Sequence, residues 1–393
     1  MSSRVVTEYL VIGGGIATAK LLSGLAQHGF SRRVTVVCDE PEIGYNRVML
    51  PVYLSGSIDL SDFKMDDAIF AYPYFSFHPN VRIIDLDLDQ HVARSACGRR
   101  YHFNKLILAT GSNVPRLNVS GENLAGVVSL RNLEDASFQL NSLGPVLVVG
   151  GGLLGIEVAD GLRQQGRQVI LAHRGSHLMN RHLDPETASR LSAHLNASGI
   201  EVLLNAEVST ITGEERVREV EFADGTRKRV DSIVKAIGTQ PNTTIAQFSG
   251  LKCGWGIEVD DCLRASVPNV FAIGECANTP GGVASLVETV GEQAKALAQT
   301  IALPTPKACG STIHGTYLKV VGLNLFAIGR IQPSDQDACI DDLRGGVYRR
   351  LFLNGSRLMG AVLFGDISGA RKISSSIGTS LNSTSCNSLA FGS

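Results

Sequence analysis

The chain has 393 residues, of which 44% are apolar and 19% are charged, so it can bury a large core and form two or three domains. Its formal net charge of −1 argues against a nucleic-acid-binding protein, because such proteins usually carry a basic excess. No two of its 8 cysteines stand at C-x-x-C spacing, which argues against a zinc ribbon or a vicinal dithiol. We expect a cytoplasmic protein without a metal site, a signal peptide or a membrane span.

Residues 9–40 predict a β-α-β unit, with two short apolar runs around a glycine-rich turn and an amphipathic helix. The turn from Gly13 to Thr18 (GGGIAT) is a G-x-G-x-x-G variant. Gly13 allows the tight bend, and Gly15 lets a pyrophosphate approach the helix N-terminus. Thr18 replaces the third glycine, which predicts either slightly looser packing of helix on strand or a side chain that is tolerated there.

Polar residues follow the second strand of this unit. Asp39 is the first candidate to hold an adenosine ribose and Glu40 the second, while a solvated loop carboxylate is the alternative. In the cluster Tyr45-Asn46-Arg47, the guanidinium of Arg47 could clamp a pyrophosphate with two hydrogen bonds. A surface arginine is the alternative for Arg47.

Residues 146–174 repeat the pattern, this time with all three glycines, Gly150, Gly152 and Gly155. Two such turns, each between a strand and a helix, indicate two dinucleotide sites far more strongly than one turn would. Here the second strand ends in His173-Arg174 with no acid. An arginine in this place can hold a 2′-phosphate and favours NADPH, whereas an exposed loop charge is an equal alternative.

Glu157 lies two residues past Gly155, on the expected first turn of the second helix. An acid there suits the helix dipole without any further role, and contact with the nicotinamide end of a nucleotide is the functional alternative. His173, His177 and His182 match no metal-ligand spacing, so we expect surface histidines.

Three further segments, residues 105–115, 232–242 and 269–278, each predict an apolar strand that ends at a glycine. After the third strand, Glu275 could accept a hydrogen bond from a ribityl hydroxyl, although an ordinary helix-start acid is the alternative. The helix expected over residues 286–301 could direct its N-terminal amides at the pyrimidine side of a flavin.

The pattern changes after residues 303–308, which contain two prolines in six residues and predict a linker. Short alternating strands follow and indicate a separate C-terminal α+β module. The last stretch, residues 374–393, is rich in Ser and Asn and is expected to be loosely ordered.

Together with ATG at 109–111, AIGTQPN at 236–242 and AIGEC at 272–276, the two turns resemble those of the flavoprotein superfamily with two dinucleotide-binding domains. The resemblance covers about residues 5–303. It implies an α/β fold in which a Rossmann-like NAD(P)H domain, residues 118–241, is inserted in a Rossmann-like FAD domain, residues 1–117 and 242–303. Residues 304–393 would form a small C-terminal α+β domain.

The resemblance also implies the residues of each site. The expected FAD residues are Gly13, Gly15, Ile16, Ala17, Asp39, Glu40, Arg47, Ala109, Thr110, Gly111, Gly274, Glu275, Val287 and Glu288. The expected NADH or NADPH residues are Gly150, Gly152, Leu153, Leu154, Gly155, Glu157, His173, Arg174 and Gly238. No catalytic side chain is required beyond the flavin itself, although Glu157 is a candidate to lie near the nicotinamide.

Within the superfamily, YNRVMLPVYLSG at 45–56 is similar to rubredoxin reductases and nitrite reductase large subunits. HLMNRHLD at 177–184, the strands at 318–329 and 360–366, and the final SLAFGS resemble the assimilatory NAD(P)H-nitrite reductase group. Three departures stand out. Thr18 replaces a glycine. Leu50-Pro51-Val52 lacks the lysine that related ferredoxin reductases carry in this segment. His can also stand where NAD enzymes carry Glu, which weakens the argument for NADPH, so the nucleotide stays NADH or NADPH.

The active-site dithiols of the superfamily's disulfide reductases are absent from the sequence, which makes thiol chemistry improbable. The resemblance therefore implies an oxidoreductase that passes electrons from NAD(P)H through FAD to a metalloprotein. Its first candidate partner is the catalytic subunit of an assimilatory nitrate or nitrite reductase, and the runner-up is a rubredoxin or ferredoxin. An NADH oxidase and a non-enzymatic flavin-binding or signalling protein are less favoured. The oligomeric state is not predicted.

Overall fold

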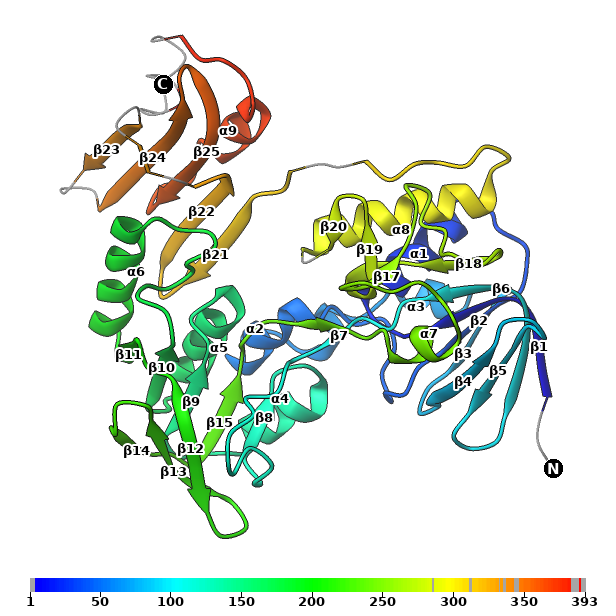
Figure 1. Ribbon diagram of the computed structural model, residues 1–393, viewed down its shortest axis with the longest axis horizontal. Coiled ribbons are helices and arrows are strands. Elements are labelled where there is room, and N and C mark those ends of the chain that lie inside the picture. Colours follow the sequence, from blue (N-terminus) through cyan, green and yellow to red (C-terminus); the bar gives the residue numbers. More distant parts are fainter. Residues whose placement is uncertain are drawn as a thin grey trace. The chain divides into compact units, whose positions relative to one another are not determined.

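The structure is a computed structural model that describes residues 4–284, 286–310, 313–331, 333–334, 337–342, 346–382 and 389. The chain forms two compact units (Figure 1). The first comprises Met1–Met49, Asp59–Asn113 and Thr239–Thr312, and the second comprises Leu50–Ile58, Val114–Gly238 and Ile313–Ser393.

A seven-stranded sheet forms the centre of the first unit, in the order β3-β2-β1-β6-β5-β4, with β18 also paired to β6. Its strands are β1 (Arg4–Ile12), β2 (Val34–Val37), β3 (Phe75–His78), β4 (Ile83–Asp87), β5 (Val92–Ser95), β6 (Arg100–Leu108) and β18 (Val270–Ala272). The pairs β2–β3, β1–β2, β1–β6 and β6–β18 are parallel, whereas β4 and β5 extend the sheet as antiparallel strands.

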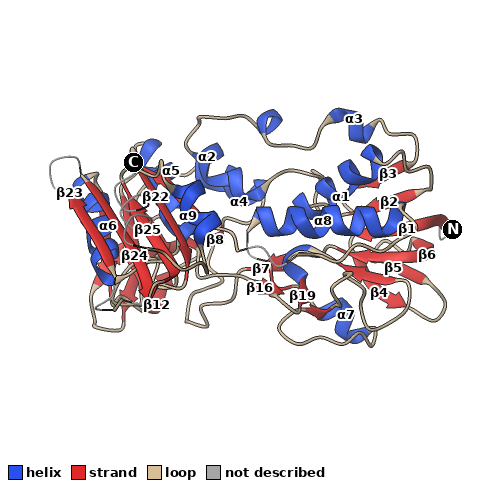
Figure 2. Ribbon diagram, turned by 90° about the horizontal axis from the view of Figure 1, so that it is seen from above, coloured by secondary structure: helices blue, strands red, loops and turns tan. Residues whose placement is uncertain are grey.

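Helices α1 (Ile16–Gln27) and α8 (Val287–Ala302) lie side by side in this unit (Figure 2). A Cβ on Gly24 would lie only 2.8 Å from the Cβ of Ala298, so a glycine is needed at this close approach of the helices. Short elements complete the unit: α3 (Asp67–Phe70), α7 (Thr244–Phe248), β17 (Ile257–Glu258), β19 (Ala277–Thr279), β20 (Gly282–Val283), and the two-stranded ribbon of β7 (Ser112–Asn113) and β16 (Gln240–Pro241).

The second unit contains a parallel five-stranded sheet in the order β11-β10-β9-β15-β8. Its strands are β8 (Val127–Ser129), β9 (Val146–Val149), β10 (Val169–His173), β11 (Ile200–Leu204) and β15 (Ser232–Lys235). The helices are α2 (Leu50–Leu54), α4 (Leu133–Leu140), α5 (Leu153–Gln164) and α6 (Pro185–Ala197), and an antiparallel sheet joins β12 (Val208–Gly213), β13 (Val217–Phe222) and β14 (Arg227–Arg229). Because β18 returns to pair with β6, the chain inserts this second parallel sheet within the first, as predicted.

The C-terminal part of the second unit is an antiparallel sheet in the order β21-β22-β25-β24-β23, next to one short helix. Its elements are β21 (Thr316–Val320), β22 (Leu323–Gly329), β23 (Ala338–Asp342), β24 (Val347–Asn354), β25 (Arg357–Phe364) and α9 (Ala370–Ser376). Within the unit, the backbone N–H of Val321 donates to the carboxylate of Asp160 on α5 at 3.0 Å. This hydrogen bond ties the C-terminal sheet to the second parallel sheet's layer of helices.

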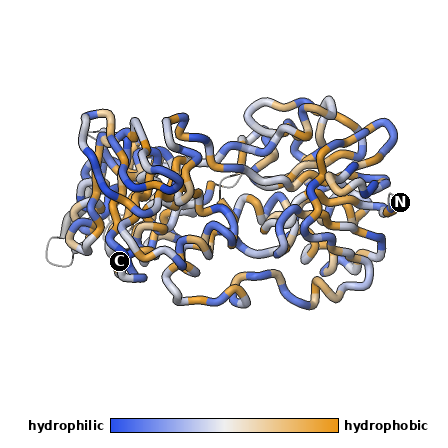
Figure 3. The backbone as a smooth tube through the Cα atoms, turned by 90° about the horizontal axis from the view of Figure 1, so that it is seen from below, coloured by the Kyte–Doolittle hydropathy of each residue, from blue (hydrophilic) through white to orange (hydrophobic). Residues whose placement is uncertain are grey.

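Figure 3 colours each residue along the backbone by its hydropathy, from blue for hydrophilic to orange for hydrophobic. Every residue of β2 and β9 is buried, as expected for parallel strands covered on both faces, while β21 alternates between buried and exposed positions. The linker residues 303–308 are exposed and form no helix or strand. Half of the final stretch that was expected to be loosely ordered, residues 383–388 and 390–393, lies outside the described residues, whereas its first residues, 374–376, close α9.

Candidate functional site

The turn between β1 and α1 requires glycine at its first position. Gly13 has a φ of +117°, and a Cβ there would lie 2.0 Å from the carbonyl oxygen of Ala109. The backbone N–H of Gly13 donates to the carbonyl of Val37 at 2.9 Å, and that of Ala109 donates to Ile12 at 2.9 Å. Gly13 and Ala109 therefore meet at the carboxyl ends of neighbouring parallel strands, where open α/β sheets bind ligands.

The helix N-terminus beside this turn is open to an anion. The nearest atom to a Cβ built on Gly15 is Nε of Arg47, at 4.0 Å. Gly15 is also the N-cap of α1 and no side chain caps it, so the amides of Ile16 and Ala17 keep hydrogen-bonding capacity that the helix cannot use. This local geometry fits the pyrophosphate of a dinucleotide.

Thr18 is accommodated by a local hydrogen bond. Its side chain is fully buried, and its Oγ1 donates to the carbonyl of Gly13 at 2.7 Å. Of the two expectations for this position, the structure shows a side chain that is tolerated. The hydroxyl of Thr18 joins the start of α1 to the first glycine of the turn.

Glu40, rather than Asp39, belongs to a cluster of hydrogen-bonded side chains beside the turn. Tyr45 donates from its hydroxyl to Oε2 of Glu40 at 2.6 Å, and Arg47 forms an ion pair with the same carboxylate. Arg47 is only 23% exposed in its side chain, so it is not the surface arginine of the alternative interpretation. Asp39 is exposed, and its assignment to the ribose stays a prediction.

Glu275 follows a glycine that packs against the first turn of α1. A Cβ on Gly274, whose φ is +79°, would lie 3.1 Å from the Cβ of Ala17. The N–H of Gly274 donates to Oε1 of the buried Gln293 on α8 at 2.8 Å. Ser112 donates from its hydroxyl to Oε2 of Glu275 at 2.8 Å. The carboxylate therefore has a defined orientation next to the glycine-rich turn.

Thr110 and Asn242 connect two segments of the chain by hydrogen bonds. One segment precedes and the other follows residues 118–241, the predicted NAD(P)H domain. Thr110 Oγ1 donates to the carbonyl of Asn242 at 2.8 Å, and Asn242 Nδ2 donates back to the carbonyl of Thr110 at 2.9 Å. The N–H of Asn242 also donates to Gly111 at 2.9 Å.

Sequence reasoning missed the roles of three residues, Ser112, Asn242 and Gln293. Asn242 stood inside a quoted motif, AIGTQPN, which could have indicated it. Nothing in the sequence marked Ser112 or Gln293, because the partner of each lies far away along the chain and meets it only in the fold.

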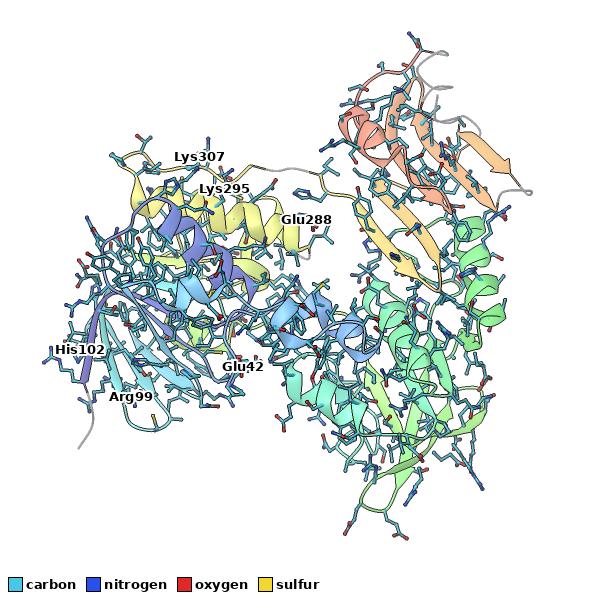
Figure 4. The ribbon with its side chains drawn as sticks, turned by 180° about the vertical axis from the view of Figure 1, so that it is seen from behind. Glu42, Arg99, His102, Glu288, Lys295 and Lys307 are labelled. Atoms are coloured by element: carbon cyan, nitrogen blue, oxygen red, sulfur yellow. The ribbon has the colours of Figure 1, made fainter. Side chains whose placement is uncertain are left out.

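The N-terminus of α8 supplies the remaining predicted FAD positions. The helix begins at Val287, one residue after the predicted start, and Leu286 is its N-cap. Glu288 is exposed at this end of α8, and Lys295 lies further along the same helix (Figure 4). Their contact with a flavin stays a prediction.

The second glycine-rich turn, between β9 and α5, repeats the backbone of the first. Gly150 has a φ of +122°, and a Cβ there would lie 2.2 Å from the carbonyl oxygen of Ala236. A Cβ on Gly152 would meet nothing within 4 Å, and Gly152 is the N-cap of α5 without a side-chain cap. Leu153, the first residue of α5, is half-buried. This turn therefore also fits a dinucleotide phosphate.

Gly155 and Leu154 lie on the first turn of α5. Gly155 has no room for a side chain, because its Cβ would lie 1.8 Å from the carbonyl of Gly150. Leu154 is half-buried next to it.

Gly238, the last predicted residue of the nucleotide site, has a φ of +99°, and a Cβ there would meet no atom within 4 Å. Gly238 follows β15 at the carboxyl end of the sheet.

His173 is not the surface histidine that was expected. It is half-buried beneath the second turn, and its Nδ1 accepts a hydrogen bond from the N–H of Gly151 at 3.2 Å. Burial lowers its pKa, and the nearby His177 and Arg174 lower it further, so the imidazole is neutral at neutral pH. His182 and Arg174 are exposed. Arg174 stays a candidate for a 2′-phosphate.

The expected place of Glu157 on its helix was wrong by one turn. α5 begins at Leu153, so Glu157 is its fifth residue, and the first turn holds no acid. The favourable effect of the helix dipole on a negative charge falls off within the first turn. It therefore accounts for an acid at position 157 less well than the sequence suggested. Burial raises the pKa of Glu157 to about 7. A carboxyl that titrates near neutrality is a common feature of binding and catalytic sites.

The cysteines with described side chains are free thiols. Cys38 and Cys276 are buried, and burial raises the pKa of both, which reduces their reactivity as thiolates. Cys386 and the final SLAFGS, apart from Leu389, lie outside the described residues. In the described ranges, His, Cys, Asp and Glu side chains form no group of three that could hold a metal, and no helix has the length and apolar character needed to cross a bilayer.

Residues 7–298 match the pyridine nucleotide-disulphide oxidoreductase family, and residues 315–381 match the rubredoxin NAD+ reductase C-terminal domain. The chain belongs to the pyridine nucleotide-disulphide oxidoreductase family. It is accordingly a flavoprotein oxidoreductase that uses FAD together with NADH or NADPH, as the sequence predicted.

Two relatives from Bacillus subtilis are similar over 94% of the chain. The nitrite reductase [NAD(P)H] is 32% identical over 379 residues, and the assimilatory nitrate reductase electron transfer subunit is 31% identical over 381 residues. These alignments cover 47% and 49% of the two relatives, so the chain spans about half their length. A rubredoxin-NAD(+) reductase from Pseudomonas putida is 30% identical, over 80% of this chain and 86% of that protein.

A solved structure confirms the architecture. The ferredoxin reductase for the CYP199A2 system from Rhodopseudomonas palustris aligns with a TM-score of 0.86, covering 95% of this chain and 96% of that one. At 23% identity, this likeness establishes the shared fold alone. The predicted fold class, two Rossmann-like domains and a small C-terminal domain, is confirmed.

Proposed function

We propose that this chain oxidises NADH or NADPH and passes the electrons to a separate redox protein, the catalytic part of an assimilatory nitrate or nitrite reductase. The two glycine-rich turns support this proposal most strongly. In each turn the helix N-terminus has no side-chain cap, and the N-cap glycine, Gly15 or Gly152, has no atom closer than 4.0 Å to the position of a Cβ. One chain thus offers two phosphate cradles. The relatives from Bacillus subtilis point to nitrogen oxyanion reduction as the pathway in which the electrons are used.

The two modules have separate tasks in this proposal. The FAD module would use residues 1–117 and 242–303, with Gly13, Gly15 and the amides of Ile16 and Ala17 at the pyrophosphate. Glu275, oriented by Ser112, would accept from the ribityl chain. Thr110 and Gly111 would lie beside it at the end of β6. Bound FAD supplies the exchange between the two-electron chemistry of a nicotinamide and the one-electron chemistry of a metalloprotein.

The nucleotide module, residues 118–241, would hold the nicotinamide dinucleotide at Gly150, Gly152 and Gly155. The imidazole of His173 fixes the N–H of Gly151, so the turn is shaped before the ligand arrives. Because the pKa of Glu157 is about 7, its carboxyl is largely protonated below that pH. The protonated carboxyl could donate a hydrogen bond to the carboxamide end of the nucleotide. Residues 304–393 would form the C-terminal domain.

The first experiment is an anaerobic titration of the purified protein with NADH and then with NADPH, followed by its visible spectrum. We expect the flavin absorbance to bleach near one equivalent of the preferred nucleotide. Bound flavin that neither nucleotide reduces would contradict the proposal and favour a flavin-binding or signalling protein.

The acceptor is identified by adding candidates to the reduced protein. Fast reoxidation by a nitrate or nitrite reductase catalytic subunit, with slow reoxidation by rubredoxin and ferredoxin, supports the proposed partner. The match of residues 315–381 to a rubredoxin reductase domain favours rubredoxin as the second candidate, which predicts the reverse order. Fast reaction with oxygen alone would identify an NADH oxidase.

A further inference from the structure

Tyr45, which is not among the expected FAD residues, lies at the centre of a hydrogen-bonded cluster of side chains. Its ring is buried at 1% exposure and packs edge-on against Phe63, with the ring centroids 6.3 Å apart. Its hydroxyl donates to Oε2 of Glu40 at 2.6 Å and accepts from Nη1 of Arg47 at 2.7 Å. Arg47 also lies over the ring, with its guanidinium carbon 5.0 Å from the centroid. One hydroxyl therefore contacts both charged partners.

The cluster is attached directly to the first glycine-rich turn. The backbone N–H of Gly44 donates to the carbonyl of Gly14 at 2.6 Å, which joins the loop that carries Tyr45 to the middle of the turn. Nε of Arg47 lies 4.0 Å from the position of a Cβ on Gly15, the glycine that borders the uncapped end of α1. Arg47 is accordingly the positive charge next to the proposed pyrophosphate position.

The hydrogen bonds leave Glu40 able to accept one more. Its Oε2 accepts from both Tyr45 and Arg47, at 2.6 and 3.3 Å, whereas Oε1 pairs with Nη2 of Arg47. A carboxylate oxygen has two lone-pair directions, so Oε1 retains one for a ribose hydroxyl. Burial raises the pKa of Tyr45, so its hydroxyl is protonated at neutral pH and can donate to Glu40.

We propose that Tyr45 is a positioning residue for the adenosine diphosphate half of FAD, holding Glu40 for the ribose and Arg47 for the pyrophosphate. This inference rests on the proposed binding of FAD at the first turn. It also chooses Glu40 over Asp39, because only Glu40 is oriented before the ligand binds. Preorganised side chains lose less conformational entropy on binding, which gives the hydroxyl of Tyr45 a measurable effect on affinity.

The test compares the two halves of FAD on the apoprotein. The Kd of FAD is measured by quenching of flavin fluorescence, and ADP and FMN are each measured as competitors of FAD. For Tyr45→Phe we expect the affinities for FAD and ADP to fall together by about tenfold, the value of one hydrogen bond to a charged group, while FMN competes as in the wild type. Competition is scored as displaced FAD, so ADP at the second turn does not contribute.

Tyr101→Phe is the matched control. Tyr101 is also fully buried in the first unit, and its hydroxyl likewise contacts an arginine, Arg99, as well as His78. It pairs with Val5 near the start of β1, whereas the glycine-rich turn follows Ile12 at the other end. Figure 4 labels Arg99 and His102, which are close to Tyr101 in the sequence, and Glu42, which lies between Glu40 and Tyr45 in the sequence. The control also removes a buried tyrosine hydroxyl, and it should leave the affinities for FAD, ADP and FMN unchanged.

The inference would be overturned if Tyr45→Phe lowered the affinities for ADP and FMN equally, or if it left the affinity for FAD unchanged. If Tyr45→Phe does not fold, Arg47→Lys replaces it, since it keeps the charge but loses the two-pronged contact, and the same ADP-selective loss is required. Wild-type apoprotein that binds no FAD would instead refute the proposed function. The two failures are therefore distinguishable.

Discussion

The two glycine-rich turns have the same backbone and different surroundings. Gly13 and Gly150 have φ values of +117° and +122°, and each leaves space for a strand carbonyl, that of Ala109 or Ala236. The residues at the end of the second strand differ in chemistry. Glu40, three residues after β2, is a carboxylate in an ion pair, whereas His173, the last residue of β10, has a neutral imidazole that accepts from the N–H of Gly151. Under the proposed function, this shared backbone would hold a phosphate at each turn, and the side chains around it would determine which nucleotide binds there.

The third glycine position shows how far this duplication can diverge. Gly155 of the second turn excludes any side chain, because a Cβ would lie 1.8 Å from the carbonyl of Gly150. The first turn holds Thr18 in the same place, and its hydroxyl donates to the corresponding carbonyl, that of Gly13. The first turn therefore has a side-chain hydrogen bond at the position where the second turn has direct contact between backbone atoms.

The largest expected effects come from alanine at the first glycine of each turn. Gly13→Ala and Gly150→Ala combine a positive φ with a Cβ about 2 Å from a backbone oxygen, so each should cost about 3 kcal/mol of unfolding free energy. Gly13→Ala should be purified without FAD, and Gly150→Ala should keep FAD but not react with NAD(P)H. Flavin content and anaerobic bleaching measure these two outcomes.

Gly29→Ala is the control for backbone strain alone. Gly29 has a φ of +63° with no atom within 4 Å of its Cβ position, so about 1 kcal/mol is expected, with both ligands retained. If Gly150→Ala also lost FAD, the turns would not act independently, and the comparison would fail.

Exchanging the third position tests whether the turns have become specialised. Gly155→Thr should destabilise the protein by about 2–3 kcal/mol, because the second turn is too close to its helix for a side chain. Thr18→Gly should cost about 2 kcal/mol, through a lost buried hydrogen bond and a glycine within a helix. Urea unfolding measures both. Equal tolerance of threonine at the two sites would show that the second turn can also accommodate a side chain, against the prediction.

Glu157 should make stability depend on pH in the second module. Its pKa is about 7 in the folded chain and near 4.5 when unfolded, so the folded state favours the neutral acid. Wild-type stability should therefore decline as pH rises from about 4.5 to above 7, whereas Glu157→Gln should not share this decline. At pH 8 the variant should be more stable by about 1–3 kcal/mol, with no difference at pH 4.

Urea unfolding at both pH values tests the prediction for Glu157. Glu186→Gln on α6, where the carboxylate is 54% exposed, provides the comparison. A Glu157→Gln variant that is less stable than the wild type at pH 8 would show that the carboxylate has a favourable partner in the folded state.

Arg174→Ala should have the smallest effect on the fold and a selective effect on the nucleotide. Arg174 is exposed, so unfolding free energy should change by no more than about 0.5 kcal/mol. If Arg174 holds a 2′-phosphate, the KM for NADPH should rise about tenfold and that for NADH should not change. Arg181→Ala, also exposed, is the control. Equal KM changes for both nucleotides would leave Arg174 as a loop charge.

The sequence by itself determined the duplicated β-α-β units, the insertion of one module in the other and the family. These properties depend on local patterns: glycine where the backbone demands a positive φ, apolar runs where strands are buried on both faces, and short motifs at strand ends. The start of α8 was predicted within one residue, because the apolar period of a long helix is easily recognised.

Only the tertiary structure decided which polar side chains meet. Ser112 donates to Glu275, which lies 163 residues further along the chain, and the hydroxyl of Tyr45 donates to Glu40, a contact that no spacing rule predicts. The expected surface position of His173 was wrong because an imidazole can fill the space beneath a glycine and satisfy its N–H. Local sequence specifies the backbone of each cradle, whereas hydrogen-bond partners depend on where distant segments are packed together.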